Sequence, residues 1–319
     1  MVLLSFVIPC YRSEKTIEKV YQEIRNTVAE RQDYDYEIIA VNDCSPDNVL
    51  AVLSKIASKD EKFKVIDLAK NFGKHSAVMA GYGFVTGDLI VSLDDDYQCP
   101  ANKLWRLVDP LLYEGYDCAT ALYKDKKESV WKKIGSRVNT VMVQLMLEHP
   151  KGLKFDNFYA FKRFICIEIL RYHNPYPFVS GLILRATHKI KMVPMEDRER
   201  ADGNSTGFTF KKSLDLLING LTSFSVIPLR MATVIGFIMA AVGFFFVVFV
   251  IVNKILNPLV TMGYSSLMAV ILFSAGMIMV MLGIIGEYIG RIFISINNSP
   301  QYVIRGTINI KRAETRKNV

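Results

Sequence analysis

Three consecutive carboxylates, Asp94 to Asp96, follow the apolar run LIVSL and precede Tyr97 and Gln98. Like charges this close repel one another and raise one another's pKa, so either water or a cation must compensate them. Carboxylate and amide oxygens at Asp94, Asp96 and Gln98 suit Mg²⁺ or Mn²⁺, which bind through one or two carboxylates plus substrate phosphates. The spacing predicts a divalent-cation site, with a solvated polar loop as the alternative.

The elements around this cluster alternate between β-branched runs and amphipathic segments. Strands are predicted at Leu3–Ile8, Glu37–Val41, Lys64–Leu68, Leu89–Leu93 and Asp117–Ala121, and helices at Glu14–Arg31, Ser76–Phe84 and Pro100–Tyr113. Strands without a polar face, separated by helices, predict an α/β fold whose mainly parallel sheet has helices on both faces. In such sheets ligands bind at the carboxyl ends of the strands. The turn after Ile8, the Asp43 turn and the acidic cluster lie there, so we expect one shared crevice.

Absent motifs, cysteine spacing and net charge narrow the classes of function that the sequence allows. There is no Gly-x-x-x-x-Gly-Lys loop and no Gly-x-Gly-x-x-Gly fingerprint, so neither a P-loop ATPase nor a dinucleotide oxidoreductase is favoured. The five cysteines lack C-x-x-C spacing, which indicates reduced, unpaired thiols. The net charge of +8 suits an anionic membrane surface. Without a nucleic-acid motif, a nucleic-acid partner is not expected.

Two uncharged apolar runs, Met231–Val252 and Leu267–Ile285, follow in the second half. Each is long enough to cross a hydrocarbon core of about 30 Å, so the sequence predicts a transmembrane hairpin; a pair of buried core helices is the alternative. The loop between the runs holds only Lys254, whereas Arg230, Arg291 and the basic tail flank the pair. This asymmetry predicts that both ends face the cytoplasm.

Two basic amphipathic segments, Ser129–Glu148 and Phe208–Arg230, are typical of interfacial helices. For the first, a core-packing helix with a solvated charged face is the alternative. The predicted organisation is a catalytic domain over 1–207, an interfacial helix over 208–230, two transmembrane helices over 231–290 and a basic cytoplasmic tail over 291–319.

The chain resembles a known family over essentially its whole length. The motifs that carry the resemblance are FVIPCYRSE, IIAVNDCSPD, KNFGKHSAVMAGY, TGDLIVSLDDDYQCP and GEYIGRIF. They are similar to those of polyisoprenyl-phosphate glycosyltransferases of glycosyltransferase family 2, including bacterial undecaprenyl-phosphate sugar transferases. The resemblance implies a GT-A enzyme of the bacterial inner membrane that moves a sugar from a nucleotide-sugar, with a UDP-sugar as the expected donor, to polyprenyl phosphate. A homo-oligomer, a tetramer in relatives, is also implied.

The resemblance assigns the donor site to residues along the first hundred positions. Nucleotide contacts are implied for Pro9, Tyr11, Glu14, Asp43, Lys74, His75 and Asp94. For His75 an ordinary helix-start residue is the alternative. The metal motif is Asp94, Asp96 and Gln98, in which Asp96 is catalytic and Asp95 has no role beyond its charge. Asn42 stands where the family usually has a second Asp.

Later motifs match less completely. Catalytic Arg200, with Gly203 and Ser205, matches an R-x-x-G-x-S loop in which Arg200 would clamp the diphosphate. Arg137, with Lys132 and Lys133, is implied to meet the acceptor phosphate, while a second basic acceptor position is Tyr123 here. In FDNFYAFKR the family's acid is Asp156 or is replaced by Asn157, and its Arg is Tyr159.

These departures leave a second class of function open, a membrane-tethered, non-catalytic nucleotide-sugar-binding or scaffold protein of the same fold. The intact Asp94, Asp96 and Gln98 set favours an enzyme. A processive polysaccharide synthase is not favoured, because such synthases carry more membrane spans and a Q-x-x-R-W motif.

Overall fold

The computed structural model describes residues 1–123, 155–196, 198, 227–257, 263–297 and 299–310. The chain divides into two compact units. The first contains Met1–Phe208 and Ser299–Val319, and the second contains Thr209–Asn298. The predicted interfacial segment at Ser129–Glu148, and residues 208–226 of the other one, lie outside the described residues.

The first unit is built on one sheet. Its strands are β1 (Val2–Cys10), β2 (Tyr34–Asn42), β3 (Phe63–Leu68), β4 (Leu89–Ser92), β5 (Cys118–Tyr123), β6 (Tyr159–Lys162), β7 (Ile190–Met195) and β8 (Ile304–Ile308). Their order is β7-β5-β6-β4-β1-β2-β3-β8. The central strands β3, β2, β1 and β4 are parallel, whereas β6 and β8 run antiparallel to their neighbours. The mainly parallel α/β sheet expected from the sequence is confirmed.

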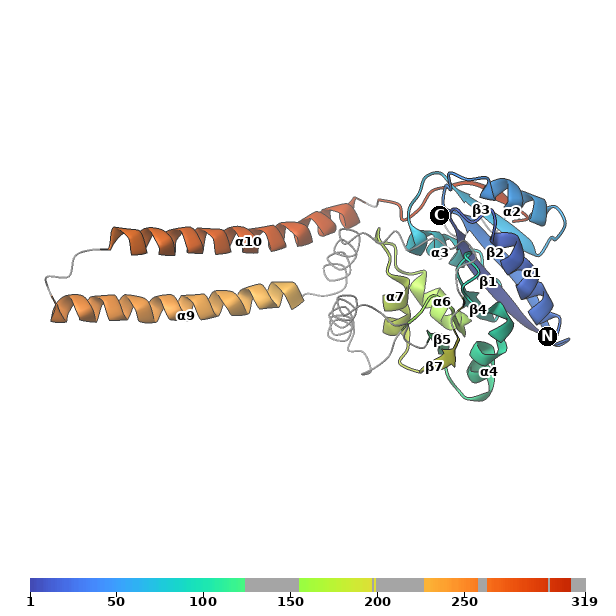
Figure 1. Cartoon of the computed structure of the whole chain (residues 1–319), viewed down its shortest axis with the longest axis horizontal. Coiled ribbons are helices and arrows are strands. Elements are labelled where there is room, and N and C mark those ends of the chain that lie inside the picture. Colours follow the sequence, from blue (N-terminus) through green and yellow to red (C-terminus); the bar gives the residue numbers. More distant parts are fainter. Residues whose placement is uncertain (124–154, 197, 199–226, 258–262, 298, 311–319) are drawn as a thin grey trace. The chain divides into compact units, whose positions relative to one another are not determined.

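Helices cover both faces of this sheet, because alternate strand residues point to opposite sides. The described helices of this unit are α1 (Ile17–Val28), α2 (Val49–Ala57), the 3₁₀ turn η1 (Ala101–Lys103), α4 (Trp105–Tyr113), α3 (Lys74–Tyr82), α6 (Arg163–Ile169) and α7 (Val179–Ala186). Leu4, Phe6 and Ile8 pack with α1, α2 and α4 in the main core. In Figure 1, α3 and α7 lie to the left of β1 and β2, and α1 lies to their right.

Helix α3 lies close against β1 and β2 because Gly81 faces them. A Cβ added at Gly81 would lie 2.4 Å from Val7 Cγ1 and 3.2 Å from Val41 Cγ2. This close approach needs a residue without a side chain. It brings Lys74, the first residue of α3, to the carboxyl ends of the central strands.

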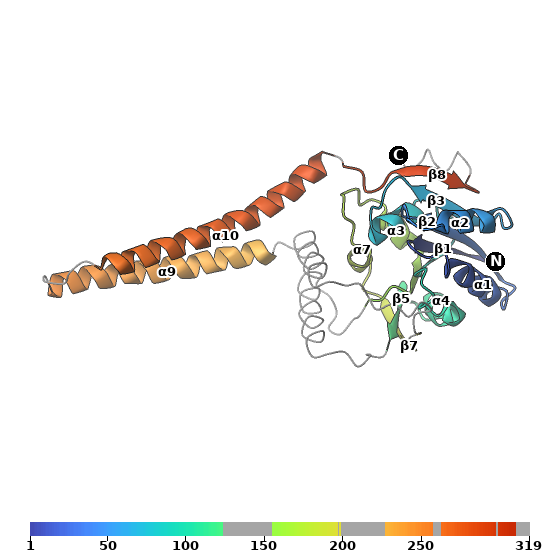
Figure 2. The same ribbon diagram turned by 45° about the horizontal axis from the view of Figure 1, so that its top comes forward.

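The segment expected as a basic tail over 291–319 is partly ordered in the sheet. Strand β8 pairs antiparallel with β3, with Ile308 opposite Val65 and Ile304 opposite Leu68. Figure 2 shows β8 along β3. The five residues IRGTI carry no clear strand alternation, and only pairing with a distant strand orders them. Strand β8 covers the edge of β3, which would otherwise present unpaired backbone groups.

The second unit is a helical hairpin of α9 (Ile227–Leu256) and α10 (Tyr264–Ile296). The two helices run side by side in both views (Figures 1 and 2). The windows Ala232–Asn253 and Phe273–Gly290 have mean hydropathies of 3.0 and 1.6, and neither window is buried. By length and composition, each helix is able to cross a membrane. The predicted C-terminal pair of apolar helices is therefore present.

Candidate active site

The loops after β1, β2 and β4 meet at the carboxyl edge of the sheet. The Tyr11 N–H donates to Asp95 Oδ2 at 2.8 Å, and the Arg12 N–H donates to Ser45 Oγ at 2.7 Å. The three loops that were expected to meet are thus hydrogen-bonded to one another. Each loop holds a non-glycine residue with positive φ: Arg12 (61°), Cys44 (49°) and Tyr97 (65°). Such backbone strain concentrates at functional sites.

The acidic loop contacts two donors from other elements. Asp94 Oδ1 pairs with Lys74 Nζ at 2.5 Å, and its Oδ2 accepts a hydrogen bond from Asn157 Nδ2 at 2.9 Å. Asp96 Oδ1 accepts the Gln98 N–H at 3.1 Å. Asn157, an amide rather than an acid, thus contacts Asp94 of the predicted metal motif, while Asp156 Oδ1 accepts the Asn157 N–H.

Asp95 has a role that the sequence did not predict. Its carboxylate joins the acidic loop to the β1 loop through the Tyr11 N–H. Burial, with the neighbouring Asp94 and Asp96 charges, raises the pKa of Asp95 to about 7, against the effect of the Tyr11 hydrogen bond. A side chain without an acceptor atom at position 95 could not make this link.

The donor atoms of the acidic loop fit a divalent ion that arrives with its substrate. Among the described residues, no group of three or more His, Cys, Asp or Glu side chains could hold a metal. The loop instead offers oxygen donors from Asp94, Asp96 and Gln98. Mg²⁺ and similar ions bind in this way, with one or two carboxylates and with phosphate oxygens of the substrate completing the shell.

Asp43 closes a loop onto the end of β2. Its Oδ1 accepts the Phe72 N–H at 2.7 Å, and its Oδ2 accepts the Gly73 N–H at 2.9 Å. Burial raises the pKa of Asp43, and the two N–H donors oppose that rise. The sequence predicted a nucleotide contact here. The structure adds a clamp on the loop before α3, and each carboxylate oxygen still has a second lone pair for a ligand.

Glu14 belongs to a second cluster, between the β1 and β2 loops. The Glu14 N–H donates to Asp47 Oδ2, and Glu14 Oε2 accepts the Asn48 N–H, each at 3.0 Å. A hollow of about 410 Å³ opens here, lined by Arg12, Glu14, Lys15, Pro46 and Asp47. Tyr11, which precedes Arg12 of this lining in sequence, is 43% exposed. Pro9 pairs with Val41 in the sheet.

His75 is placed at the site but carries no positive charge there. Its ring meets Phe178 edge-on, with centroids 5.4 Å apart. Burial, together with the Lys74 charge, lowers the pKa of His75 to about 4. A neutral imidazole can donate a hydrogen bond to a ligand but cannot pair with a diphosphate charge.

Tyr159, which replaces the Arg expected in relatives, lies in β6 opposite Ser92. Its hydroxyl is 3.0 Å from the Tyr82 hydroxyl, and its ring packs 4.9 Å from Phe155 and 6.1 Å from Phe161. Tyr159 is 7% exposed. An aromatic cluster therefore occupies this position, where an unpaired charge would be costly to bury.

Arg198 is a further site residue that sequence reasoning missed. It forms two hydrogen bonds with Glu23 of α1, at 2.8 and 2.7 Å, and its guanidinium lies 4.9 Å from the Tyr97 ring centroid. Gln98 Nε2 donates to its backbone oxygen at 3.4 Å. Arg198 thus joins the segment after β7 to α1 and to the acidic loop. No local pattern indicates a pair that is 175 residues apart.

A second hollow, of about 270 Å³, lies at the opposite edge of the sheet, where β2 and β3 begin. Its lining includes Arg25, Lys55 and Asp60, and the Asp60 carboxylate accepts the hydroxyls of Tyr21 and Tyr36. None of the predicted site residues lines this hollow.

Six of the predicted site residues lie outside the described residues. They are Arg200, Gly203, Ser205, Lys132, Lys133 and Arg137.

Comparison with known proteins agrees with this arrangement. The family model "Glycosyl transferase family 2" matches residues 5–170, which include β1 to β4 and the acidic loop. The chain belongs to glycosyl transferase family 2. A second model, "GtrB C-terminal hairpin", matches residues 227–292 of this family 2 glycosyltransferase, the region of α9 and α10.

Curated relatives cover both units. The chain is 31% identical over 308 residues to the uncharacterized glycosyltransferase YkcC of Bacillus subtilis (strain 168), covering 96% of this chain and 94% of the relative. It is 32% identical over 319 residues to the undecaprenyl-phosphate 4-deoxy-4-formamido-L-arabinose transferase of Enterobacter sp. (strain 638), covering 98% and 96%. The protein is thus a glycosyltransferase.

Solved structures show the fold. Mannosyl-3-phosphoglycerate synthase from Rubrobacter xylanophilus matches with a TM-score of 0.50 and 16% identity, over 68% of this chain and 72% of that chain. Glucosyl-3-phosphoglycerate synthase from Mycobacterium tuberculosis matches with a TM-score of 0.50 and 19% identity, over 70% and 80%. Both likenesses concern the GT-A-like architecture.

Proposed function

We propose that this family 2 glycosyltransferase moves a sugar from a UDP-sugar to undecaprenyl or another polyprenyl phosphate, with Mg²⁺ or Mn²⁺ bound beside Asp96. The observation that carries the proposal is the full-length similarity to a transferase named for undecaprenyl phosphate, hairpin included. UDP and Mn²⁺ are named with the glucosyl-3-phosphoglycerate synthase of similar fold. The intact acidic loop supports the same donor class.

The acceptor chemistry explains why no strong base is required. A phosphate monoester has a second pKa near ~6, so the lipid phosphate is largely a dianion at neutral pH. One of its oxygens attacks the anomeric carbon while the bond from that carbon to the diphosphate breaks, and UDP leaves. No general base is therefore assigned to His75, whose pKa is lowered to about 4 by burial.

The protein must instead bind and orient two anions that repel each other. Asp43 would read the uracil, with Pro9, Tyr11 and Glu14 lining the nucleoside. Lys74 beside Asp94, and Arg200 further along, would hold the donor phosphates. A divalent ion at Asp94, Asp96 and Gln98, when bound, would neutralise the charge on the leaving diphosphate.

A lipid acceptor requires a site beside a membrane. Helices α9 and α10 would span the bacterial inner membrane, with the catalytic unit and the C-terminus in the cytoplasm, where nucleotide sugars are made. Arg137, Lys132 and Lys133 would meet the acceptor phosphate, because an Arg fork binds two phosphate oxygens and stays charged near a bilayer. Assembly into a homo-tetramer is part of the proposal.

The test is a transfer assay with the purified full chain. Undecaprenyl phosphate, Mn²⁺ or Mg²⁺ and a panel of UDP-sugars are supplied, and lipid-linked sugar and released UDP are both measured. Stoichiometric release of UDP and formation of lipid-linked sugar, abolished by EDTA, is expected. Absence of transfer from every UDP-sugar, while another nucleotide sugar reacts, would overturn the donor assignment.

Asp96→Ala is the central variant. Removal of a group that stabilises charge in the transition state is expected to lower turnover by ~10³ or more. Asp88→Ala is the matched control, because Asp88 lies just before β4 and its carboxylate accepts the Leu3 N–H. Asp88→Ala is expected to keep turnover while lowering stability. Near-normal turnover of Asp96→Ala with saturating donor would rule out the metal role.

A further inference from the structure

A chain of hydrogen bonds connects strand β8 to the proposed nucleotide site. Arg305 Nε donates to Asp67 Oδ2 at 2.7 Å, and Arg305 Nη2 donates to Asp67 Oδ1 at 3.1 Å. Asp67 Oδ1 also accepts Asn42 Nδ2 at 2.8 Å. Asp67 and Asn42 are register partners at the carboxyl ends of β3 and β2, 9% and 2% exposed. Arg305 therefore supplies the positive charge that a largely buried carboxylate needs.

The chain continues from Asn42 into the β1 and β2 loops. Asn42 Oδ1 accepts the Ser45 N–H at 3.1 Å, and Ser45 Oγ accepts the Arg12 N–H at 2.7 Å. Ser45 Oγ also donates to Asp47 Oδ1 at 2.5 Å, and Asp47 Oδ2 accepts the Glu14 N–H. Of these residues, Arg12, Glu14 and Asp47 line the 410 Å³ hollow, and Ser45 precedes Pro46 of its lining in sequence. Asn42 is thus joined to this wall through Ser45.

Charge at position 42 explains why this chain has an amide there. A carboxylate at position 42 would lie at hydrogen-bonding distance from the Asp67 carboxylate, and two such charges repel. Asn42 donates to Asp67 instead, and Arg305 neutralises Asp67. The three side chains thus form one compatible set: an amide on β2, a carboxylate on β3 and a guanidinium on β8.

We infer that Arg305, which follows the helical hairpin in sequence, is a positioning residue of the nucleoside site and acts on it through Asp67 and Asn42. The inference rests on the proposed nucleotide donor. Arg305 does not touch the reacting atoms in this proposal. It fixes the β2 loop that presents Asp43 and the wall formed with Glu14.

The test measures UDP binding with Mn²⁺ to the full chain by calorimetry, with Mn²⁺–pyrophosphate as a ligand that lacks the nucleoside. Arg305→Ala is expected to weaken UDP binding about tenfold, because Asp67 loses its charged partner and Asn42 is no longer held in place. Pyrophosphate binding is expected to stay within about twofold of wild type, since it does not use this wall. Arg305→Lys should recover part of the loss, because a single ammonium replaces the fork.

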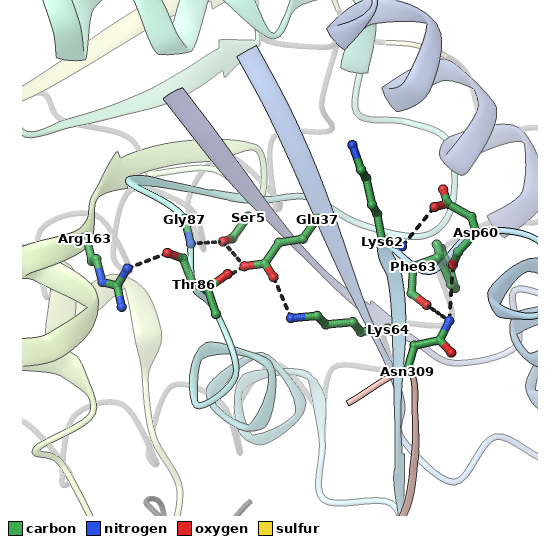
Figure 3. Close-up of polar contacts among 10 residues, drawn as sticks. All are labelled: Ser5, Glu37, Asp60, Lys62, Phe63, Lys64, Thr86, Gly87, Arg163 and Asn309. Atoms are coloured by element: carbon green, nitrogen blue, oxygen red, sulfur yellow. Dashed lines mark hydrogen bonds and ion pairs between the residues drawn. The ribbon is translucent and has the colours of Figure 1, made fainter. Parts of the chain in front are cut away.

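Asn309→Ala is the matched control on the same segment. Asn309 Nδ2 donates to the backbone oxygens of Phe63 at 2.9 Å and Asp60 at 3.2 Å, at the other end of β3 (Figure 3). It also donates to the backbone oxygen of Ala57 at 2.7 Å. This variant is expected to lower the melting temperature without changing UDP affinity. Equal loss of UDP affinity in Asn309→Ala and Arg305→Ala would mean that Arg305 only docks the strand, and would overturn the inference.

The charge argument has its own pair of variants. Asn42→Asp is expected to weaken UDP binding, because two carboxylates would face each other. Asn42→Asp combined with Asp67→Asn restores one amide and one carboxylate, and should regain at least half of the lost affinity. Failure of this rescue, with both proteins folded by circular dichroism, would contradict the compatible set.

Amide hydrogen exchange separates this inference from the donor assignment. Exchange at the backbone amides of Arg12 and Ser45 is expected to be faster in Arg305→Ala than in wild type and unchanged in Asn309→Ala. That readout needs no nucleotide. If wild type bound no UDP, the donor assignment would fail, and exchange alone would decide the positioning role. Unchanged exchange in Arg305→Ala would overturn it.

Discussion

Glu37 is a buried carboxylate in the middle of β2, away from the site. It accepts hydrogen bonds from Ser5 Oγ at 2.5 Å and the Thr86 N–H at 2.6 Å, and pairs with Lys64 Nζ at 2.8 Å (Figure 3). Burial alone would raise the pKa of Glu37, but these three donors outweigh it and lower the pKa. The interactions therefore stabilise the fold above the unfolded pKa of about 4.3 and lose that effect as pH falls below it.

Lys64→Met tests this ion pair. The variant leaves a buried charge without its cation, and we expect a loss of about 3 kcal/mol in unfolding free energy at neutral pH. Glu37→Gln combined with Lys64→Met removes both charges and keeps an acceptor for Thr86, so it should cost less than Lys64→Met alone. Urea unfolding of wild type, Lys64→Met and the double variant measures both losses in unfolding free energy. A larger loss in the double variant would contradict the assignment.

Asp95 gives a pH dependence of the opposite sign. Its pKa is raised to about 7 when folded and is about 3.9 unfolded, so only the folded state keeps this proton between those values. Stability from this group therefore falls as pH rises through that window. Asp95→Asn keeps an acceptor for the Tyr11 N–H and removes the titration. Without divalent ions, we expect the unfolding free energy of the variant, relative to wild type, to be about 2–4 kcal/mol higher at about pH 8 than at about pH 4. The same difference between variant and wild type at the two pH values would refute this prediction.

At the scale of elements, α1 and the segment after β7 are joined by Glu23 and Arg198. The pair is partly buried, with side-chain exposures of 12% and 27%. Arg198 also lies two residues before Arg200 in sequence, so loss of the pair is expected to affect the proposed diphosphate contact. We expect Arg198→Ala to raise the donor KM and lower turnover by about tenfold, as for loss of a bidentate charged pair.

Charge reversal is the control for that pair. Glu23→Arg or Arg198→Glu alone is expected to be as harmful as Arg198→Ala. The combined variant re-forms an ion pair and should recover part of the turnover, although the Asn102 N–H loses its acceptor at Glu23 Oε1. Steady-state kinetics with donor and lipid varied separately provide the measurement. No recovery, with the fold intact, would assign Arg198 a role other than this pairing.

At the scale of the whole molecule, the hairpin α9–α10 is inserted between two stretches of one unit. The chain leaves that unit after Phe208 and returns at Ser299 to form β8. Because β8 pairs with β3 on the catalytic sheet, the residues before and after the hairpin must lie on the same side of any membrane it crosses. This requirement agrees with the lysine and arginine distribution in the sequence.

Topology reporters test that arrangement. A reporter fused after Val319 is expected to be active only as a cytoplasmic fusion, and one inserted near Met262 only as an external one. Accessibility of single cysteines at the same positions provides an independent measurement. A C-terminus outside the membrane would contradict both the hairpin and the pairing of β8 with β3.

Local patterns in the sequence determined most of the fold. Apolar runs and helical periodicity predicted β1 to β5, α1, α3 and the region of α4, because apolar residues recur at short, regular intervals along an element that is buried on one face. Long uncharged runs predicted the apolar hairpin. The acidic loop was found in the same way, since its residues are adjacent. The convergence of the strand ends followed from the parallel order alone.

Tertiary structure decided what each side chain contacts. Asp43 clamps Phe72 and Gly73, Asn157 faces Asp94, and Arg198 meets Glu23. Arg305 reaches Asp67 across 238 residues, on a strand too short and irregular to be recognised by itself. Periodicity reports only which face of an element is buried. The partner of a charged side chain depends on how the whole chain brings distant segments together.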